Sequence, residues 1–229
     1  MSWRLTVSDL LHVFRQKDKE DADDVLLKSG KPDYLGVNYY HEGTIQQNQL
    51  EKPVKDDRQK SFNATDPYLM QPKDAQAQDP EIPMYNQVDN PFLKQTEWSW
   101  DIDPAGFRVT LRELTEKYGL PMLITENGLG ASDELKDGKV DDGYRIDYLK
   151  KHVQAMQEAI TDGCDVIGYC AWSFTDLLSW LNSYKKRYSF VYVDRDDDSQ
   201  RTLDRIPKKS YYWYQHVIAT DGADLTMQS

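Results

Sequence analysis

The segment Pro121-Met122-Leu123-Ile124 constrains the fold more than any other stretch of this sequence. Its residues are apolar without polar alternation, which predicts a strand buried on both faces, as in a parallel sheet. Thr125-Glu126-Asn127-Gly128 follows and sets one carboxylate where the strand ends. Strand ends of this kind carry the nucleophile in many α/β barrels. A glutamate before Asn-Gly can equally belong to a simple turn, and these residues alone leave both interpretations open.

Helix and strand patterns alternate along the second half of the chain. A helix is predicted over 104–118, with an aspartate N-cap, a proline at the first helical position and a glycine stop. Apolar residues at three- and four-residue spacing predict a second helix over 146–160. Runs rich in aromatic and β-branched residues at 34–40 and 166–172 predict two further strands, the latter also buried. The alternation is typical of an α/β fold with a parallel sheet, although three strands cannot close a barrel.

The remaining segments are less regular. Residues 41–97 contain six prolines, many glutamines and little periodicity, so we expect a long loop insertion that is a functional lid or mobile. Short helices are expected at 8–14 and 21–29, a hairpin at 190–205 and a last helix over 207–216.

Composition narrows the classes of function. A chain of 229 residues with 39% hydrophobic content can bury a core, as one large domain or two small ones. A net charge of −11 argues against general binding to nucleic acid or anionic membranes, which needs a cationic surface. No membrane-spanning stretch or signal peptide is expected, which favours a cytoplasmic location. Two cysteines and four scattered histidines indicate neither a disulfide framework nor a metal site, and no cofactor is expected.

Four segments, in this order and spacing, resemble the carboxy-terminal part of the family 1 glycoside hydrolases. They are Leu35-Gly36-Val37-Asn38-Tyr39-Tyr40, Trp98-Ser99-Trp100-Asp101-Ile102-Asp103-Pro104, Ile124-Thr125-Glu126-Asn127-Gly128, and Trp172-Ser173 through Tyr192-Val193-Asp194. The resemblance covers most of residues 30–218 and implies retaining β-glycosidase chemistry on a TIM (β/α)8 barrel. It identifies the three predicted strands with the sixth, seventh and eighth of that barrel. Residues 1–229 would then be the carboxy-terminal part of a single barrel domain.

The resemblance assigns catalytic roles to two residues. Retaining hydrolysis needs one ionised carboxylate to attack the anomeric carbon and a second carboxylic acid, about 5–5.5 Å away, to protonate the leaving oxygen. Glu126 matches the nucleophile, and Tyr40 matches the phenol that keeps that carboxylate charged by a hydrogen bond. Asn38, on the same strand face as Tyr40, matches the amide that reaches the sugar hydroxyl next to the reacting carbon. Without the resemblance, Asn38 and Tyr40 would be read as parts of an ordinary aromatic-rich strand.

Tryptophans form the other expected substrate contacts, since apolar sugar faces suit aromatic rings. By the same resemblance, Trp100 is the platform on which the leaving group stacks, and Trp172 and Trp180 are walls of the sugar site. Buried tryptophan is more often core than ligand platform, so the three others are interpreted as structural: Trp3, Trp98 and Trp213.

Ser179 indicates a subfamily, because ordinary β-glucosidases of the family have glutamate at the matching position. A carboxylate there would repel a phosphate of charge about −1.5 to −2, whereas a hydroxyl can donate to it. Ser179, Lys186 and Tyr188 match the phosphate clamp of the 6-phospho-β-glucosidases. A short basic run is otherwise usually a solvated turn. Ser183 and Ser189 depart from the family pattern, which usually has glycine there, so different local turns are expected.

The matching acid/base segment is missing. No Asn-Glu-Pro occurs in the chain, and the first five barrel strands have no counterpart. We therefore expect a truncated or separately expressed half, with exposed edges at strands 34–40 and 166–172 and either the amino-terminal half or a second copy as partner. The expected substrate is a phosphorylated β-glucoside. A non-catalytic sugar-phosphate binding module remains the rival interpretation, and the sequence does not decide between glucoside and galactoside.

Overall fold

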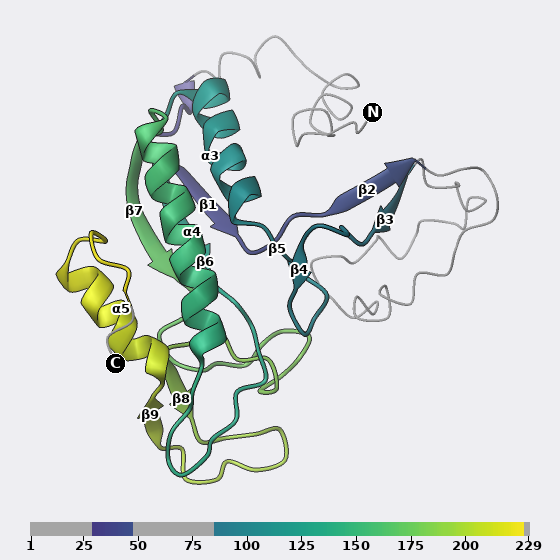
Figure 1. The fold of residues 1–229 in the computed structure, drawn as a ribbon, viewed down its shortest axis with the longest axis vertical. Helices are drawn as coiled ribbons and strands as arrows, with labels where there is room; N and C mark the ends of the chain where they lie inside the picture. The colour runs from purple at the N-terminus through teal and green to yellow at the C-terminus, as the bar shows by residue number, and fades with distance from the viewer. Residues whose placement is uncertain (1–28, 48–84, 227–229) are drawn as a thin grey trace.

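The computed structural model describes residues 29–47 and 85–226, and its centre is a three-stranded parallel sheet. The sheet has the order β1-β6-β7, formed by Leu35–Tyr39, Met122–Asn127 and Val166–Ala171. Helix α3 (Pro104–Tyr118) connects into β6, and helix α4 (Gly143–Thr161) connects β6 to β7. Both helices lie on one face of the sheet (Figure 1). The described fold is therefore α/β, as the alternating sequence pattern predicts.

Smaller antiparallel pairs surround this sheet. Three two-stranded sheets are formed by β2 (Thr44–Gln47) with β3 (Tyr85–Val88), β4 (Lys94–Gln95) with β5 (Asp101–Ile102), and β8 (Val191–Val193) with β9 (Arg205–Pro207). Helix α5 (Lys209–Ala219) is the last helix or strand of the described chain. The expected loop 41–97 thus has paired strands within it, while its central part, 48–84, lies outside the described residues. So do the expected helix 8–14 and all but the last residue of the expected helix 21–29.

Local sequence signals set the bounds of α3. The Asp103 carboxylate accepts a hydrogen bond from the Gly106 amide at 2.8 Å and so caps the first turn. Pro104 has no amide hydrogen to leave unpaired at the first helical position. Gly119 ends the helix with φ of 58°, a left-handed conformation that a side chain would disfavour. The predicted bounds, 104–118, are confirmed.

Two hydrophobic clusters hold the layers together. One lies between the sheet and the two helices and includes Val37, Phe107 and Ile124, the last two fully buried. The other joins α4 to α5 and to the loops after β6 and β7 through Leu149, Phe190 and Trp213 among others. Trp213 is therefore a core residue, as expected. Burial in strand β1 alternates, so Val37 and Tyr39 face the helices and Asn38 is exposed on the opposite face.

A buried ionic network fixes the loops at the carboxyl ends of the strands. Three cations and three carboxylates take part, and all six side chains are buried: Arg145, Arg187, Lys208, Asp133, Asp142 and Asp176. Lys208 donates to Asp176 at 2.8 Å and to Ser189 at 3.1 Å, and also bonds Asp133. The network therefore ties the loop after β6 to the loop after β7 and to the start of α5.

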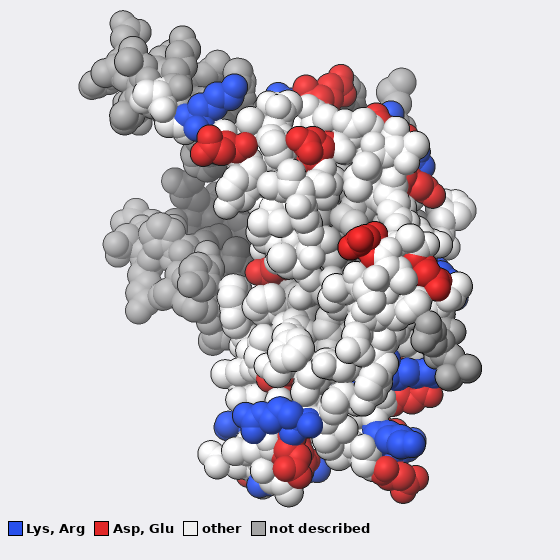
Figure 2. Space-filling view, turned by 90° about the vertical axis from the view of Figure 1, so that its left-hand side faces the viewer, with Lys and Arg blue, Asp and Glu red and all other residues white. Residues whose placement is uncertain are grey.

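The outer side of β7 is less buried than its sequence predicts. Ile167 is 57% exposed, and among the described residues β7 has a neighbouring strand on one side only. Figure 2 shows the side of the molecule at which β7 lies in Figure 1, and its central area carries few charged residues. Large exposed apolar side chains on β7, on the loop after it and on α5 include Ile167, Phe174, Leu178, Trp180, Tyr212 and Ile218.

Candidate active site

A β-bulge in β6 directs the Glu126 side chain. In the pairing with β1, Val37 is opposite Ile124 and Asn38 is opposite Glu126, so Thr125 is an extra residue in β6. The β6–β7 pairing shifts in the same place. An extra residue turns the following side chain to the other face of the strand, and bulges of this kind occur next to active sites. Glu126 thereby shares the exposed face of Asn38 instead of pointing toward the helices.

Tyr40 contacts this carboxylate directly. Its hydroxyl donates a hydrogen bond of 2.7 Å to Oε2 of Glu126. Burial raises the pKa of the Tyr40 hydroxyl, and the hydrogen bond to Glu126 raises it further, so Tyr40 stays protonated and remains a donor. The contact expected between these two residues is present, and it leaves the other oxygen of the half-buried carboxylate available to attack an electrophile.

Asn127 fixes the strand ends on either side of Glu126. Its side chain is fully buried and donates to the Tyr39 carbonyl at 2.7 Å and to the Tyr148 hydroxyl at 3.2 Å. It also accepts a 2.6 Å hydrogen bond from the Tyr169 hydroxyl on β7. Tyr148 in turn donates to the Tyr40 carbonyl at 2.9 Å. All three strands and α4 are thereby joined through one amide, which restricts movement of the Tyr40–Glu126 pair.

Asn38 lies beside this pair on the same face. Its Oδ1 atom accepts a hydrogen bond of 2.5 Å from the hydroxyl of Thr125, the bulge residue. The bond fixes which way the amide faces, because its carbonyl oxygen is engaged on the β6 side. Asn38 is exposed, so its NH2 group can meet a ligand hydroxyl at the ends of β1 and β6.

Lys186 is surrounded by aromatic rings. Its Nζ atom lies 3.3 Å from the ring centroid of Trp100, 5.0 Å from that of Trp98 and 5.4 Å from that of Tyr188. The residue is only 3% exposed, and burial lowers the pKa of the ammonium to about 8. Tyr40 places its ring edge-on to both Trp100 and Tyr188, at centroid distances of 5.9 and 6.0 Å. The rings of Trp98, Trp100 and Tyr188 form an aromatic cage around Lys186, and this cage adjoins the Tyr40–Glu126 pair.

Two glycines allow the backbone after β6 to lie close to Lys186, Tyr188 and Trp172. A Cβ atom on Gly130 would lie 2.6 Å from Cε of Lys186 and 2.8 Å from Cζ of Tyr188. A Cβ atom on Gly128 would lie 2.1 Å from the carbonyl oxygen of Trp172, where the ends of β6 and β7 meet. Side chains at either position would displace the residues that form the site.

The structure separates some of the other predicted site residues. Trp172 is half-buried, and its amide donates to the Asn127 carbonyl at 2.8 Å, beside the strand ends. Trp180 is 83% exposed. Ser179 exchanges backbone hydrogen bonds with Ser183 at 2.8 and 2.9 Å, and among the described residues no hydrogen bond joins it to Lys186. Lys186 and Tyr188 come together; Ser179 does not join them here.

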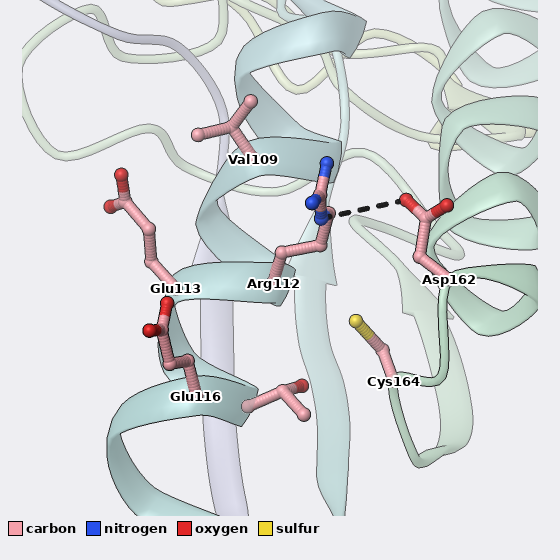
Figure 3. Close-up of a pocket in the computed structure, with 7 residues that line it drawn as sticks. Val109, Arg112, Glu113, Glu116, Asp162 and Cys164 are labelled. Atoms are coloured by element: carbon pink, nitrogen blue, oxygen red, sulfur yellow. Dashed lines mark ion pairs between the residues drawn. The ribbon is translucent and has the colours of Figure 1, made fainter.

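A surface cavity of about 430 Å³ lies elsewhere, against α3 (Figure 3). Asp162 and Cys164, before the start of β7, line one side of it, and Arg112 pairs with Asp162 at 3.6 Å. This is the opposite end of the strands from Glu126, and none of the predicted site residues lines the cavity. Within the described ranges, no group of three or more histidine, cysteine or acidic side chains is placed to hold a metal ion. No helix there is long and apolar enough to cross a membrane.

The chain belongs to glycosyl hydrolase family 1, whose model matches residues 8–223. Among its relatives is the aryl-phospho-β-D-glucosidase BglC of Bacillus subtilis, 49% identical over 211 residues, covering 90% of this chain and 41% of that protein. The 6-phospho-β-glucosidase AscB of Escherichia coli is 48% identical over 138 residues, covering 59% of this chain and 29% of the relative.

Solved structures similar to this chain belong to the same family. The family 1 β-glucosidase of Thermotoga maritima is similar with a TM-score of 0.68 and 31% identity, covering 88% of this chain and 38% of that one. The chain spans about 40% of the length of two curated relatives from Bacillus subtilis, BglC and the aryl-phospho-β-D-glucosidase BglH, and each match covers 90% of this chain.

Sequence reasoning missed two features of the site. The bulge at Thr125 has no signal in the residue types, because it depends on how β6 pairs with two other strands. The aromatic cage includes Trp98, which we expected to be structural only, and its contact with Lys186 is not local in sequence. Gly130 was the one residue in the sequence that could have indicated the cage, since glycine often marks a place where another part of the protein comes close to the backbone.

Proposed function

We propose that this chain supplies the nucleophile and the phosphate-recognition residues of a retaining 6-phospho-β-glucosidase. The observation that carries the proposal is the 2.7 Å hydrogen bond between Tyr40 and Glu126 at the carboxyl ends of parallel strands. In this mechanism, one oxygen of Glu126 attacks the anomeric carbon while Tyr40 stabilises the other. Water then hydrolyses the glycosyl ester with retention of configuration.

Lys186 and the relatives support a phosphorylated substrate. Buried charges are normally paired, and Lys186 has rings but no carboxylate as partner among the described residues. An anion on the substrate would complete its surroundings, and the names of the relatives specify a phospho-β-glucoside. Tyr188 beside it and Ser179 on the same loop would donate hydroxyl groups to the phosphate once the loop adjusts. Asn38, Trp100, Trp172 and Trp180 are assigned to the sugar and the leaving group.

The general acid is assigned to protein outside these residues. β1, β6 and β7 would be the sixth, seventh and eighth strands of a TIM barrel, and residues 1–229 its carboxy-terminal part. The apolar side chains exposed along β7 and α5 fit burial against further barrel strands. We therefore place the amino-terminal half of the barrel, carrying the second carboxylate, as the partner of this chain. The substrate would arrive in the cytoplasm through an import route that phosphorylates sugars.

Reconstitution tests the proposal. Purified residues 1–229 should not hydrolyse a 6-phosphorylated β-linked disaccharide, because its leaving group needs a proton donor. Addition of a separately expressed amino-terminal half should restore turnover, and Glu126→Gln should abolish it. An unphosphorylated disaccharide should react far more slowly in the same mixture. Efficient turnover by this chain as a monomer would contradict the assignment of the acid to another segment.

A further inference from the structure

Lys186 differs from the other buried cations of the described chain. Each of those is bonded to at least one carboxylate: Arg145, Arg187 and Lys208. Lys186 is buried to the same degree, yet its described contacts are the ring faces of Trp98, Trp100 and Tyr188. A cation held only by rings loses less on leaving its site than one held by a carboxylate.

The ammonium covers the ring on which a leaving group would stack. Nζ lies 3.3 Å above the centroid of Trp100, which is within van der Waals contact of the indole face. The His41 ring also stacks on Trp100, at a centroid distance of 4.6 Å and an angle of 27°. An aryl group needs the same space above an indole. One of these two side chains must move before an aromatic leaving group can stack on Trp100.

Lys186 is the side chain suited to move. It has a flexible four-carbon stem, and among the described residues no hydrogen bond holds its ammonium. The stem lies against Gly130, which has no side chain to interlock with it; an added methyl group would collide with Cγ and Cε of Lys186. His41, by comparison, has a ring nitrogen 3.1 Å from the Glu42 carbonyl in addition to its stacking contact.

We propose that Lys186 is a displaceable cover on Trp100, drawn off by the phosphate of the substrate, so that the phosphate and an aromatic leaving group are recognised cooperatively. The proposal rests on the proposed function, which assigns the phosphate to Lys186. It adds a specificity rule: an aryl leaving group improves binding mainly when the sugar carries the phosphate. A cation–π contact of a desolvated ammonium corresponds to roughly a two- to thirtyfold change in affinity, which sets the expected size of this coupling.

A four-ligand binding cycle tests the coupling. The ligands are methyl and phenyl β-glucoside, each with and without a 6-phosphate, titrated by calorimetry into the chain of residues 1–229. In the wild type, replacing methyl by phenyl should increase affinity at least threefold more for the phosphorylated pair than for the unphosphorylated pair. Lys186→Ala should make the two increments equal and should improve binding of the unphosphorylated phenyl glucoside. Lys185→Ala, at the exposed neighbouring lysine, is the matched control and should keep the wild-type difference.

The phosphate assignment and the displaceable cover predict different outcomes of the binding cycle. If the phosphate adds no affinity in the wild type, the phosphate assignment itself is wrong. If the phosphate adds affinity but the phenyl increment is the same with and without it, the cover is wrong and the phosphate assignment stands.

A second measurement is independent of affinity. In the free chain, the Lys186 ε-methylene proton resonance, assigned through Lys186→Arg, should be shifted upfield by the Trp100 ring current. Glucose 6-phosphate should move it toward the position of the Lys185 signal. An unshifted Lys186 signal in the free chain would overturn the proposal.

Discussion

Replacing Lys208 by methionine tests whether the buried ionic network stabilises the loops that carry the site. Lys208 is fully buried and donates to Asp133, Asp176 and Ser189. Its loss leaves three carboxylates with two guanidinium groups, and so one uncompensated buried charge. Breaking a buried pair costs about 3–5 kcal/mol. Asp133 and Asp176 each keep an arginine, at 2.9 and 2.6 Å, so the lower figure applies.

Urea unfolding followed by fluorescence measures this loss. With an m value of about 2–3 kcal/mol/M for a chain of this size, Lys208→Met should lower the midpoint by roughly 1–1.5 M. Lys209→Met is the matched control, because its 3.1 Å pair with Asp141 is exposed and worth at most about 1 kcal/mol. Adding Asp176→Asn to Lys208→Met restores charge balance and should recover part of the loss. Equal, small midpoint shifts for the variants at 208 and 209 would refute the reasoning.

Three further changes have defined outcomes. Gly128→Ala should destabilise the chain by about 2–3 kcal/mol or more, because the added methyl group would collide with the Trp172 carbonyl oxygen. Gly143→Ala is the control: its methyl group would make only ordinary contacts, so the melting temperature measured by thermal unfolding should not fall. Ser183→Gly should stabilise the chain by about 0.5 kcal/mol, since Ser183 has φ of 53°, and an unchanged or lower melting temperature would contradict this. Burial lowers the pKa of His152 from 6.5 to about 4, so as pH falls the unfolded chain takes up this proton before the folded chain does. The free energy of unfolding should therefore drop by roughly 1.4 kcal/mol between pH 8 and 5.5. His152→Gln should lack this part of the pH dependence.

Local patterns predicted the elements that position Glu126. The cap and stop residues of α3 determine its bounds within the sequence, and the apolar run before Thr125 forms β6 as expected. The contact between Tyr40 and Glu126 was predicted through the family resemblance, because the two residues are 86 positions apart. Their roles in catalysis remain proposals.

The ionic network and the aromatic cage were beyond sequence reasoning. In a chain with net charge −11, Asp133 and Asp176 look like two of many surface carboxylates, and only the tertiary fold buries them beside Lys208. Ser189, expected to alter a turn, instead donates a hydrogen bond to Asp176 inside this network. Ser183 does occupy a turn with positive φ, which explains why glycine suits the position. Such contacts depend on how long loops pack, which residue spacing does not encode.

The most direct test of the central claim is to identify the carboxylate that bonds to the sugar. The chain, together with an amino-terminal half, is incubated with an activated 2-deoxy-2-fluoro aryl 6-phospho-β-glucoside, whose glycosyl ester hydrolyses slowly, and is then digested for peptide mass spectrometry. The account predicts one ester, on Glu126, absent from Glu126→Gln and formed more slowly by Tyr40→Phe. An ester on any other carboxylate, or undiminished labelling of Glu126→Gln, would contradict it.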